Sequence, residues 1–189
     1  MAWLRIIGGT ARGRRIQGPR QPGLRPTADR VRQVIFDILG QRFEGGEVLD
    51  LYAGTGALAL EALSRGATRA RLVDSSPEAL ELCLENATTL GFTDRAFTLR
   101  HRLPAGLGQL DLRPVDLLFA DPPYDAPTAC NEVLHWLAAS GILSPGGVAI
   151  LEHSRRISLD TQIAGPHPLQ QSDQRLFGDT EVSFYARKD

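Results

Sequence analysis

The chain has 189 residues, of which 42% are hydrophobic and 23% charged, and its formal net charge is −1. These values are typical of one globular domain with a small extension and argue against disordered, collagen-like and disulfide-rich proteins. No apolar run approaches the ~20 residues of a membrane helix, and the first residues do not form a secretory signal. We therefore expect a cytoplasmic protein with no membrane partner. Cys83 and Cys130 lack metal-ligand spacing, so we expect no metal site.

Charge is distributed unevenly along the chain. Residues 1–32 contain eight arginines and one acidic residue, whereas the rest of the chain contains 13 basic and 21 acidic residues. A basic segment on an acidic body is typical of a protein that binds a polyanion such as a nucleic acid. The alternative is a plain solvated surface in an arginine-biased protein, since Lys188 is the only lysine. That bias does not explain the scarcity of acidic residues in the segment.

The N-terminal residues predict a small extension to the main domain. Residues 3–7 and 14–16 flank a glycine-containing turn and predict a short hairpin. A loop over 18–26 follows, and Thr27 is expected to cap a helix whose apolar residues recur at helical spacing and which ends at Gly40. We therefore expect a basic hairpin-and-helix extension over 1–40 and a main domain over 41–189.

From residue 47 onward, apolar segments alternate with amphipathic ones. The pattern predicts strands over 48–52, 70–74, 97–100, 115–120 and 147–151, with helices over 57–64, 77–90 and 127–139. Apolar strands interleaved with helices are typical of a parallel, doubly wound sheet. Residues 169–177 and 181–185 are expected to form an antiparallel pair at a sheet edge. The predicted fold class is α/β and Rossmann-like.

A glycine-rich turn joins the first of these strands to the next helix. Gly54 and Gly56 allow a tight turn and a close approach of backbone to ligand, and Ala59 fills the third small position. Asp74, at the end of the second strand, is placed to accept ribose hydroxyls, or alternatively to cap the following helix. A carboxylate at Asp50 would repel a pyrophosphate, whereas it suits the cationic methionine end of S-adenosylmethionine.

Asp121, Pro122, Pro123 and Tyr124 follow the most apolar strand, where open α/β sheets bind their ligands. Prolines donate no backbone hydrogen bond, so the turn offers acceptors: the Asp121 carboxylate and the Pro122 carbonyl. Two such acceptors fit a planar amine of a nucleobase and free its lone pair to attack a methyl group, with Asp121 as proton acceptor. Tyr124 offers a ring for base stacking, worth ~1–3 kcal/mol. The alternative is an ordinary turn beside a core tyrosine.

Taken together, these residues resemble a class I S-adenosylmethionine-dependent methyltransferase and, more narrowly, the RsmD family. The resemblance covers nearly the whole chain, in the segments 5–9, 12–13, 25–32, 36–39, 49–58, 61–66, 121–124 and 177–180. The motif at 121–124 is shared with DNA adenine and cytosine amino-methyltransferases. The run from Arg25 to Arg32 is what distinguishes the RsmD family from these other methyltransferases. The family implies a seven-stranded, mostly parallel sheet with an antiparallel last strand.

The resemblance implies methylation of the N2 amine of one guanine, conventionally guanine 966, in 16S ribosomal RNA of an assembling small ribosomal subunit. We expect a monomer. An amino-methyltransferase of DNA or RNA acting on adenine N6 or cytosine N4 is the alternative of the same class. A nicotinamide-dependent dehydrogenase and a non-catalytic RNA-binding factor are alternatives of other classes.

The expected site residues fall into three sets. Catalysis is expected at Asp121, Pro122, Pro123 and Tyr124. S-adenosylmethionine is expected at Asp50, Tyr52, Ala53, Gly54, Thr55, Gly56, Asp74, Ser75, Arg102, Leu103 and Asp121. RNA is expected at Arg5, Arg12, Arg14, Arg15, Arg25, Thr27, Arg30 and Arg32.

Overall fold

The computed structural model describes residues 2–19, 26–40, 45–110, 113–123 and 126–188. The chain divides into two compact units, Met1–Arg100 and His101–Asp189. The residues expected to form the N-terminal extension lie in the first unit. Each unit is an arrangement of strands with covering helices, and the expected α/β, Rossmann-like class is confirmed.

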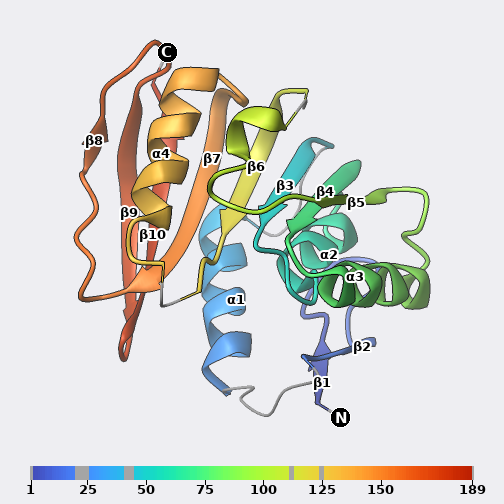
Figure 1. Ribbon diagram of the computed structural model, residues 1–189. Helices are drawn as coiled ribbons and strands as arrows, with labels where there is room; N and C mark the ends of the chain where they lie inside the picture. The colour runs from blue at the N-terminus through green and yellow to red at the C-terminus, as the bar shows by residue number, and fades with distance from the viewer. Residues whose placement is uncertain (1, 20–25, 41–44, 111–112, 124–125, 189) are drawn as a thin grey trace. The chain divides into compact units, whose positions relative to one another are not determined.

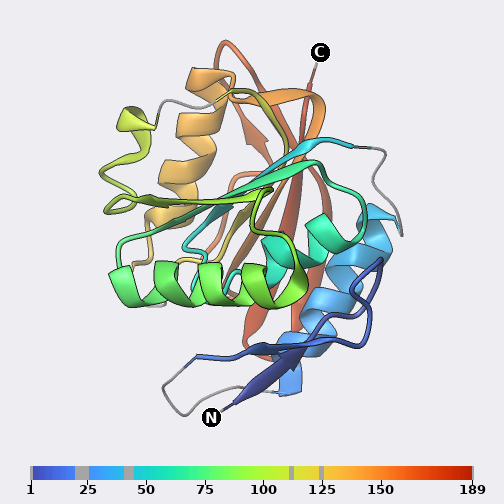
Figure 2. The same cartoon turned by 90° about the vertical axis from the view of Figure 1, so that its right-hand side faces the viewer.

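The first unit is built on three parallel strands in the order β5-β4-β3. These strands are β3 (Glu47–Leu51), β4 (Arg69–Asp74) and β5 (Ala96–Arg100). Parallel neighbours need crossover connections, which α2 (Ala57–Ser64) and α3 (Pro77–Leu90) supply. Both helices lie against the same face of the strands (Figures 1 and 2).

Local signals explain where α3 begins and ends. The Ser76 hydroxyl accepts the Ala79 N–H at 3.2 Å, and Pro77 occupies the first turn. Gly91 has a φ of 77° and ends the helix in the left-handed conformation. Because these signals are local, the predicted bounds of this helix match the observed ones.

The N-terminal elements of this unit are a hairpin and a helix. β1 (Trp3–Arg5) pairs with β2 (Arg15–Gln17) as the sequence predicts, and β2 lies beside α3 (Figure 1). The helix α1 (Pro26–Leu39) begins one residue before its expected cap, Thr27. Proline is favoured in a first helical turn because its φ is already helical and its missing N–H is not needed there.

The second unit contains β6 (Val115–Ala120) and β7 (Leu143–Ser154), which run parallel. β10 (Thr180–Arg187) pairs antiparallel with β7 and with β9 (Leu169–Phe177), and the two-residue β8 (Gln162–Ile163) pairs with β9. The helix α4 (Ala129–Ser140) covers one face of the strands, and a short 3-10 helix (Leu107–Gln109) precedes β6 (Figure 1). The expected antiparallel final strands are thus present.

Strand β7 is longer than the sequence pattern predicts. It begins at Leu143 and includes Pro145, Gly146 and Gly147, which mark a turn in sequence. The register with β6 shifts between Val115 and Leu117, so the extra residues are accommodated as an irregularity of the ladder. No helix in the described part of the chain has the length and apolar character to cross a membrane.

Candidate functional site

The glycine turn follows β3 and leads into α2. Gly54 and Gly56 have φ angles of 55° and 74°, a region that favours glycine. A Cβ atom on Gly56 would lie 2.7 Å from Leu72 Cδ2, so the turn also packs tightly against β4. The N–H of Ala53 donates to the carbonyl of Val73 at 3.0 Å. The turn is a compact, well-supported loop whose backbone a ligand can approach closely.

Asp74 ends β4 and supports two neighbouring backbone segments. Its Oδ2 accepts the N–H of Gly54 at 3.0 Å, and its Oδ1 accepts the N–H of Ser76 at 2.9 Å. The capping alternative considered from the sequence is wrong, because the hydroxyl of Ser76 caps α3 and Asp74 only accepts the N–H of that cap residue. An ionised carboxylate has about four lone-pair sites, so this half-buried residue can also accept ribose hydroxyls. The exposed Ser75 lies next to it in the chain.

Asp50 is a buried acid in β3, with 3% of its surface exposed. Its Oδ2 accepts the N–H of Ala59 at 3.2 Å, in the first turn of α2, where the helix dipole favours a negative charge. Burial, followed by the charges of Asp50 and Asp74, raises the pKa of the Cys83 thiol far above its ordinary value. Two carboxylates thus act on this region, which suits a cationic ligand better than a pyrophosphate.

Two residues of α3 hold the glycine turn and were not singled out as site residues in the sequence. The Cys83 thiol donates to the carbonyl of Gly54 with a sulfur–oxygen distance of 3.4 Å, and Asn86 Nδ2 donates to the carbonyl of Thr55 at 3.0 Å. Cys83 and Asn86 are three positions apart and therefore share a helix face. Their spacing is the only signal in the sequence, and it does not reveal which loop they contact.

The remaining expected cofactor residues lie near these elements or in the second unit. Tyr52 has a φ of 62°, which is rare for a residue with a side chain, and Thr55 is half-buried. Arg102 is exposed and Leu103 half-buried, just after β5. Their contacts with a cofactor remain predictions.

The turn after β6 carries the expected catalytic residues. Asp121 and Pro123 are exposed and Pro122 is half-buried. The Pro123 carbonyl accepts the N–H of Ala126 at 3.0 Å, which closes the turn. Tyr124 lies outside the described residues. Asp121 thus lies at the carboxyl end of a parallel strand, which is where proteins of this fold class bind their ligands.

Glu152 on β7 is a second carboxylate beside Asp121, and the sequence did not single it out. The strand register pairs Ala120 with Leu151, so positions 121 and 152 follow in step. Burial and then the charge of Asp121 raise the pKa of Glu152 from 4.5 to about 8. Water reaches Asp121, but surrounding protein desolvates its carboxylate and raises its pKa from 3.8 to about 6. Both carboxyl groups therefore ionise at a higher pH than ordinary acidic side chains.

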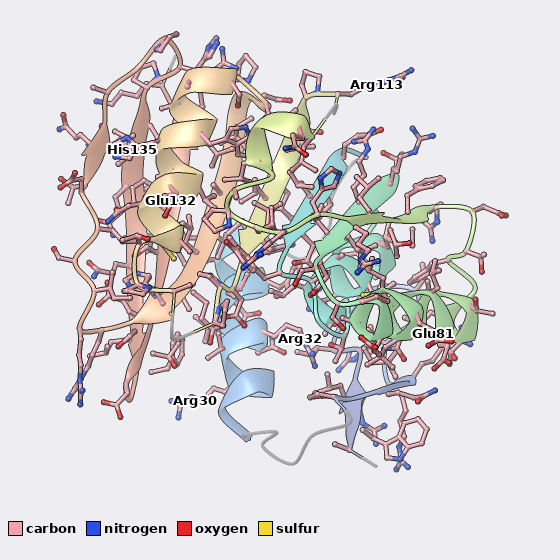
Figure 3. The ribbon with its side chains drawn as sticks, viewed as in Figure 1. Arg30, Arg32, Glu81, Arg113, Glu132 and His135 are labelled. Carbon is pink, nitrogen blue, oxygen red and sulfur yellow. The ribbon has the colours of Figure 1, made fainter. Side chains whose placement is uncertain are left out.

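Most of the described N-terminal arginines lie on the surface. Arg5, Arg12, Arg15 and Arg30 are exposed, and Arg30 extends from α1 (Figure 3). Arg5, Arg12 and Arg30 line an open pocket of about 550 Å³ together with Ile6, Ile7, Gly13 and Gln33. A concave surface lined by three arginines is suited to a phosphate backbone.

Two of the expected RNA residues also have structural roles. The Arg14 guanidinium donates to the carbonyl of Leu90 at 3.0 Å and to that of Thr89, and so caps the end of α3. Arg32 is only 4% exposed and donates to the carbonyl of Arg5 at 2.7 Å. Both have partners within the fold, which the charge pattern could not indicate. Arg25 and the side chain of Thr27 lie outside the described residues.

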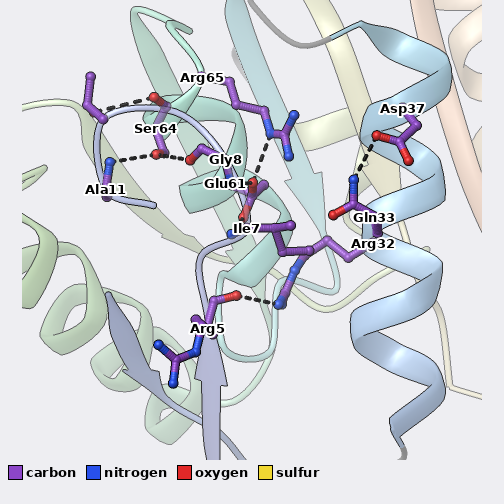
Figure 4. Close-up of polar contacts among 11 residues, drawn as sticks. Arg5, Ile7, Gly8, Ala11, Arg32, Gln33, Asp37, Glu61, Ser64 and Arg65 are labelled. Atoms are coloured by element: carbon purple, nitrogen blue, oxygen red, sulfur yellow. Dashed lines mark hydrogen bonds and ion pairs between the residues drawn. The ribbon is translucent and has the colours of Figure 1, made fainter. Parts of the chain in front are cut away.

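A buried carboxylate attaches the hairpin to α2 (Figure 4). Glu61 is 0% exposed and accepts the N–H groups of Ile7 at 2.8 Å and Gly8 at 2.7 Å. It also accepts a 2.8 Å bond from Nε of Arg65, whose guanidinium lies over the Phe36 ring of α1. The hairpin is therefore held in one position relative to α2.

A hydroxyl at the end of α2 adds to this attachment (Figure 4). Ser64 Oγ donates to the carbonyl of Gly8 at 2.6 Å and accepts the N–H of Ala11 at 2.9 Å. The Ser64 carbonyl accepts the N–H of Thr10 at 2.7 Å. The surface arginines of the hairpin are thus presented from a well-supported backbone.

Comparison with known proteins identifies relatives along nearly the whole chain. The family model described as Conserved hypothetical protein 95 matches residues 4–186. The chain is 40% identical over 158 residues to Ribosomal RNA small subunit methyltransferase D of Escherichia coli (strain K12), covering 84% of this chain and 78% of that protein. It is 30% identical to YlbH of Bacillus subtilis (strain 168) over 98% of this chain and 100% of that protein.

A solved structure supports the same assignment. The structure of YhhF from Escherichia coli superposes with a TM-score of 0.84 and 30% identity and covers 99% of each chain. The resemblance inferred from the sequence is therefore confirmed at the level of family and fold. The chain belongs to the Conserved hypothetical protein 95 family, which is the RsmD family of methyltransferases.

Proposed function

We propose that this protein transfers a methyl group from S-adenosylmethionine to the exocyclic N2 amine of a guanine in 16S ribosomal RNA of the small ribosomal subunit. The name of the Escherichia coli relative, a small subunit ribosomal RNA methyltransferase, supports this class of substrate. The observation that carries the proposal is the exposed Asp121 directly after β6, followed by two prolines that donate no backbone hydrogen bond. The guanine base and its N2 position rest on the family resemblance.

The first unit supplies the residues that would hold the cofactor. Gly54 and Gly56 bring the backbone close to a ligand, and Asp74 has lone pairs for ribose hydroxyls. Asp50 adds the negative charge that a cationic methionine group requires. When bound, S-adenosylmethionine supplies an electrophilic methyl group on a positively charged sulfur. Tyr52, Ala53, Thr55, Ser75, Arg102 and Leu103 remain proposed contacts.

Asp121 prepares the amine and receives its proton. Its carboxylate and the Pro122 carbonyl accept the two amine hydrogens, which favours a pyramidal nitrogen with a free lone pair. A pKa near 6 leaves the Asp121 carboxylate mostly ionised at neutral pH and makes it a stronger base than an ordinary aspartate. Stacking of the base on the ring of Tyr124 is part of the proposal.

Residues 1–40 provide the RNA contacts in this proposal, and residues 41–189 carry out the reaction. The exposed Arg5, Arg12, Arg15 and Arg30 contact phosphates, whereas the exposed Arg14 also binds the end of α3 and the buried Arg32 supports the hairpin backbone. The substrate is ribosomal RNA in an assembling subunit, and the enzyme acts in the cytoplasm as a monomer.

Methylation of small subunits that lack the modification tests the proposal. Labelled S-adenosylmethionine is incubated with the protein and the subunits, and the modified nucleotide is mapped by mass spectrometry. We expect one labelled guanine, with the methyl group on N2. The variant Asp121→Ala is expected to lose turnover by orders of magnitude with little change in cofactor affinity, while exposed Asp94→Asn serves as control.

Other outcomes discriminate among the alternatives. Label on adenine N6 or cytosine N4 would identify the related amino-methyltransferase class. RNA binding without methylation, unaffected by Asp121→Ala, would identify a non-catalytic RNA-binding factor. Calorimetric binding of NAD, with none of S-adenosylmethionine, would identify a dehydrogenase.

A further inference from the structure

Asn86 joins the hairpin to the glycine turn through one side chain. It lies on α3 with 0% of its surface exposed. Its Oδ1 accepts the N–H of Gln17 at 2.8 Å, and its Nδ2 donates to the Gln17 carbonyl at 3.0 Å. The same Nδ2 donates to the carbonyl of Thr55 at 3.0 Å. Both donors of the amide are therefore used, one on each of two segments far apart in the chain.

The Asn86 side chain binds the backbone of two separate segments, the hairpin and the glycine turn. With Gln17, the amide makes the paired N–H and C=O contacts that an adjoining strand would make. Thr55 lies between Gly54 and Gly56, so the bond to its carbonyl restrains the peptide between the two positive-φ glycines. A buried amide with three backbone partners has few ways to relax when either segment moves, because each unmade bond leaves an unsatisfied polar group.

We propose that Asn86 is a positioning residue that makes cofactor binding and RNA binding depend on each other. The inference rests on the proposed function, in which the glycine turn holds S-adenosylmethionine and the hairpin contacts RNA. A ligand that restrains Thr55 also restrains Gln17 through the shared amide. In the same way, a ligand bound to the hairpin restrains Thr55 through Gln17 and Asn86. Such a coupling is reciprocal, with typical factors of about 5–150 in affinity.

Ser64 provides a matched control for this role. Like Asn86, it is a buried polar residue on a helix, 1% exposed, that bonds to hairpin backbone. Among the described residues, its hydrogen-bond partners outside α2 are Gly8, Thr10 and Ala11 of the hairpin loop, and none of these belongs to the glycine turn. Ser64→Ala therefore weakens the attachment of the hairpin without disturbing Thr55 directly.

Amide hydrogen exchange with and without S-adenosylhomocysteine tests the link in the absence of RNA. In the unmodified protein, the ligand is expected to slow exchange at least about 5-fold in peptides covering residues 14–18. Asn86→Leu should abolish this slowing while S-adenosylhomocysteine still binds, and Ser64→Ala should retain it. Equal slowing in Asn86→Leu and the unmodified protein, or none in the unmodified protein, overturns the proposal. Circular dichroism establishes whether each variant is folded. If Asn86→Leu does not fold, Asn86→Ser takes its place.

A second measurement tests the same coupling with RNA. The affinity for S-adenosylhomocysteine is measured by calorimetry with and without a saturating small subunit RNA fragment. We expect about 5-fold or more tightening in the unmodified protein and in Ser64→Ala, and a factor near 1 in Asn86→Leu. If RNA tightens the binding of S-adenosylhomocysteine to Asn86→Leu as much as to the unmodified protein, the proposed role of Asn86 is wrong. Absence of methylation by the unmodified protein would instead refute the proposed function, because the exchange measurement requires neither RNA nor turnover.

Discussion

Replacement of Glu61 by glutamine is expected to destabilise the protein strongly. The carboxylate is completely buried and neutralises the guanidinium of Arg65, whose side chain is 1% exposed, at 2.8 Å. It also accepts the N–H groups of Ile7 and Gly8. Removing one partner of a buried ion pair costs about 3–5 kcal/mol. Since whole domains are stable by about 5–15 kcal/mol, Glu61→Gln should leave a marginal fold.

Urea unfolding followed by circular dichroism measures this loss. The exposed Glu81 on α3 provides the control, and Glu81→Gln should change the free energy of unfolding by less than about 0.5 kcal/mol (Figure 3). Trypsin cleavage after Arg12 under native conditions should also accelerate in Glu61→Gln, because glutamine has one oxygen acceptor and cannot accept both the Ile7 and the Gly8 N–H as the two carboxylate oxygens do. A loss below about 1 kcal/mol for Glu61→Gln would refute the reasoning that the buried Glu61 carboxylate contributes strongly to stability.

Three further predictions concern the site. Gly56→Ala places a Cβ atom 2.7 Å from Leu72 Cδ2 at a φ of 74° and should therefore distort the glycine turn. Calorimetry should show at least about 10-fold weaker binding of S-adenosylhomocysteine. An unchanged affinity would show that binding does not depend on the exact conformation of the turn. Burial raises the folded-state pKa of Glu152 to about 8, so its contribution to stability is lost as pH rises through that value. The free energy of unfolding in urea should fall by on the order of 1 kcal/mol between pH 7 and 9, a loss that Glu152→Gln removes. Arg12→Gln and Arg15→Gln should each lower the slope of log affinity for RNA against log salt by about one unit in a filter-binding titration, whereas an unaltered slope would exclude phosphate contact.

Elements with local signals could be predicted from the sequence. The helices over 57–64 and 77–90 have the predicted bounds, since their glycines, proline and capping serine lie within a few residues of each end. Strand β7 extends beyond its prediction because Pro145, Gly146 and Gly147 are turn formers in isolation, whereas pairing with neighbouring strands determines their conformation here.

The site was predictable only where residue type and strand position suffice. Asp74 and Asp121 follow parallel strands, which the alternating pattern reveals. Arg14 could not be separated from the surface arginines, because its partner Leu90 lies 76 positions away. The same limit applies to Asn86, since its contact with Thr55 depends on how α3 packs and not on its neighbours in sequence.

The hairpin also has a consequence for how the chain matures during synthesis. Its partners lie far downstream: Glu61 and Ser64 hold its loop, Asn86 holds its second strand, and Leu90 binds Arg14. Because these partners follow the hairpin in the chain, its set of supports is complete only after α3 has been synthesised. Truncation before residue 90 would therefore leave the hairpin without its full set of supports.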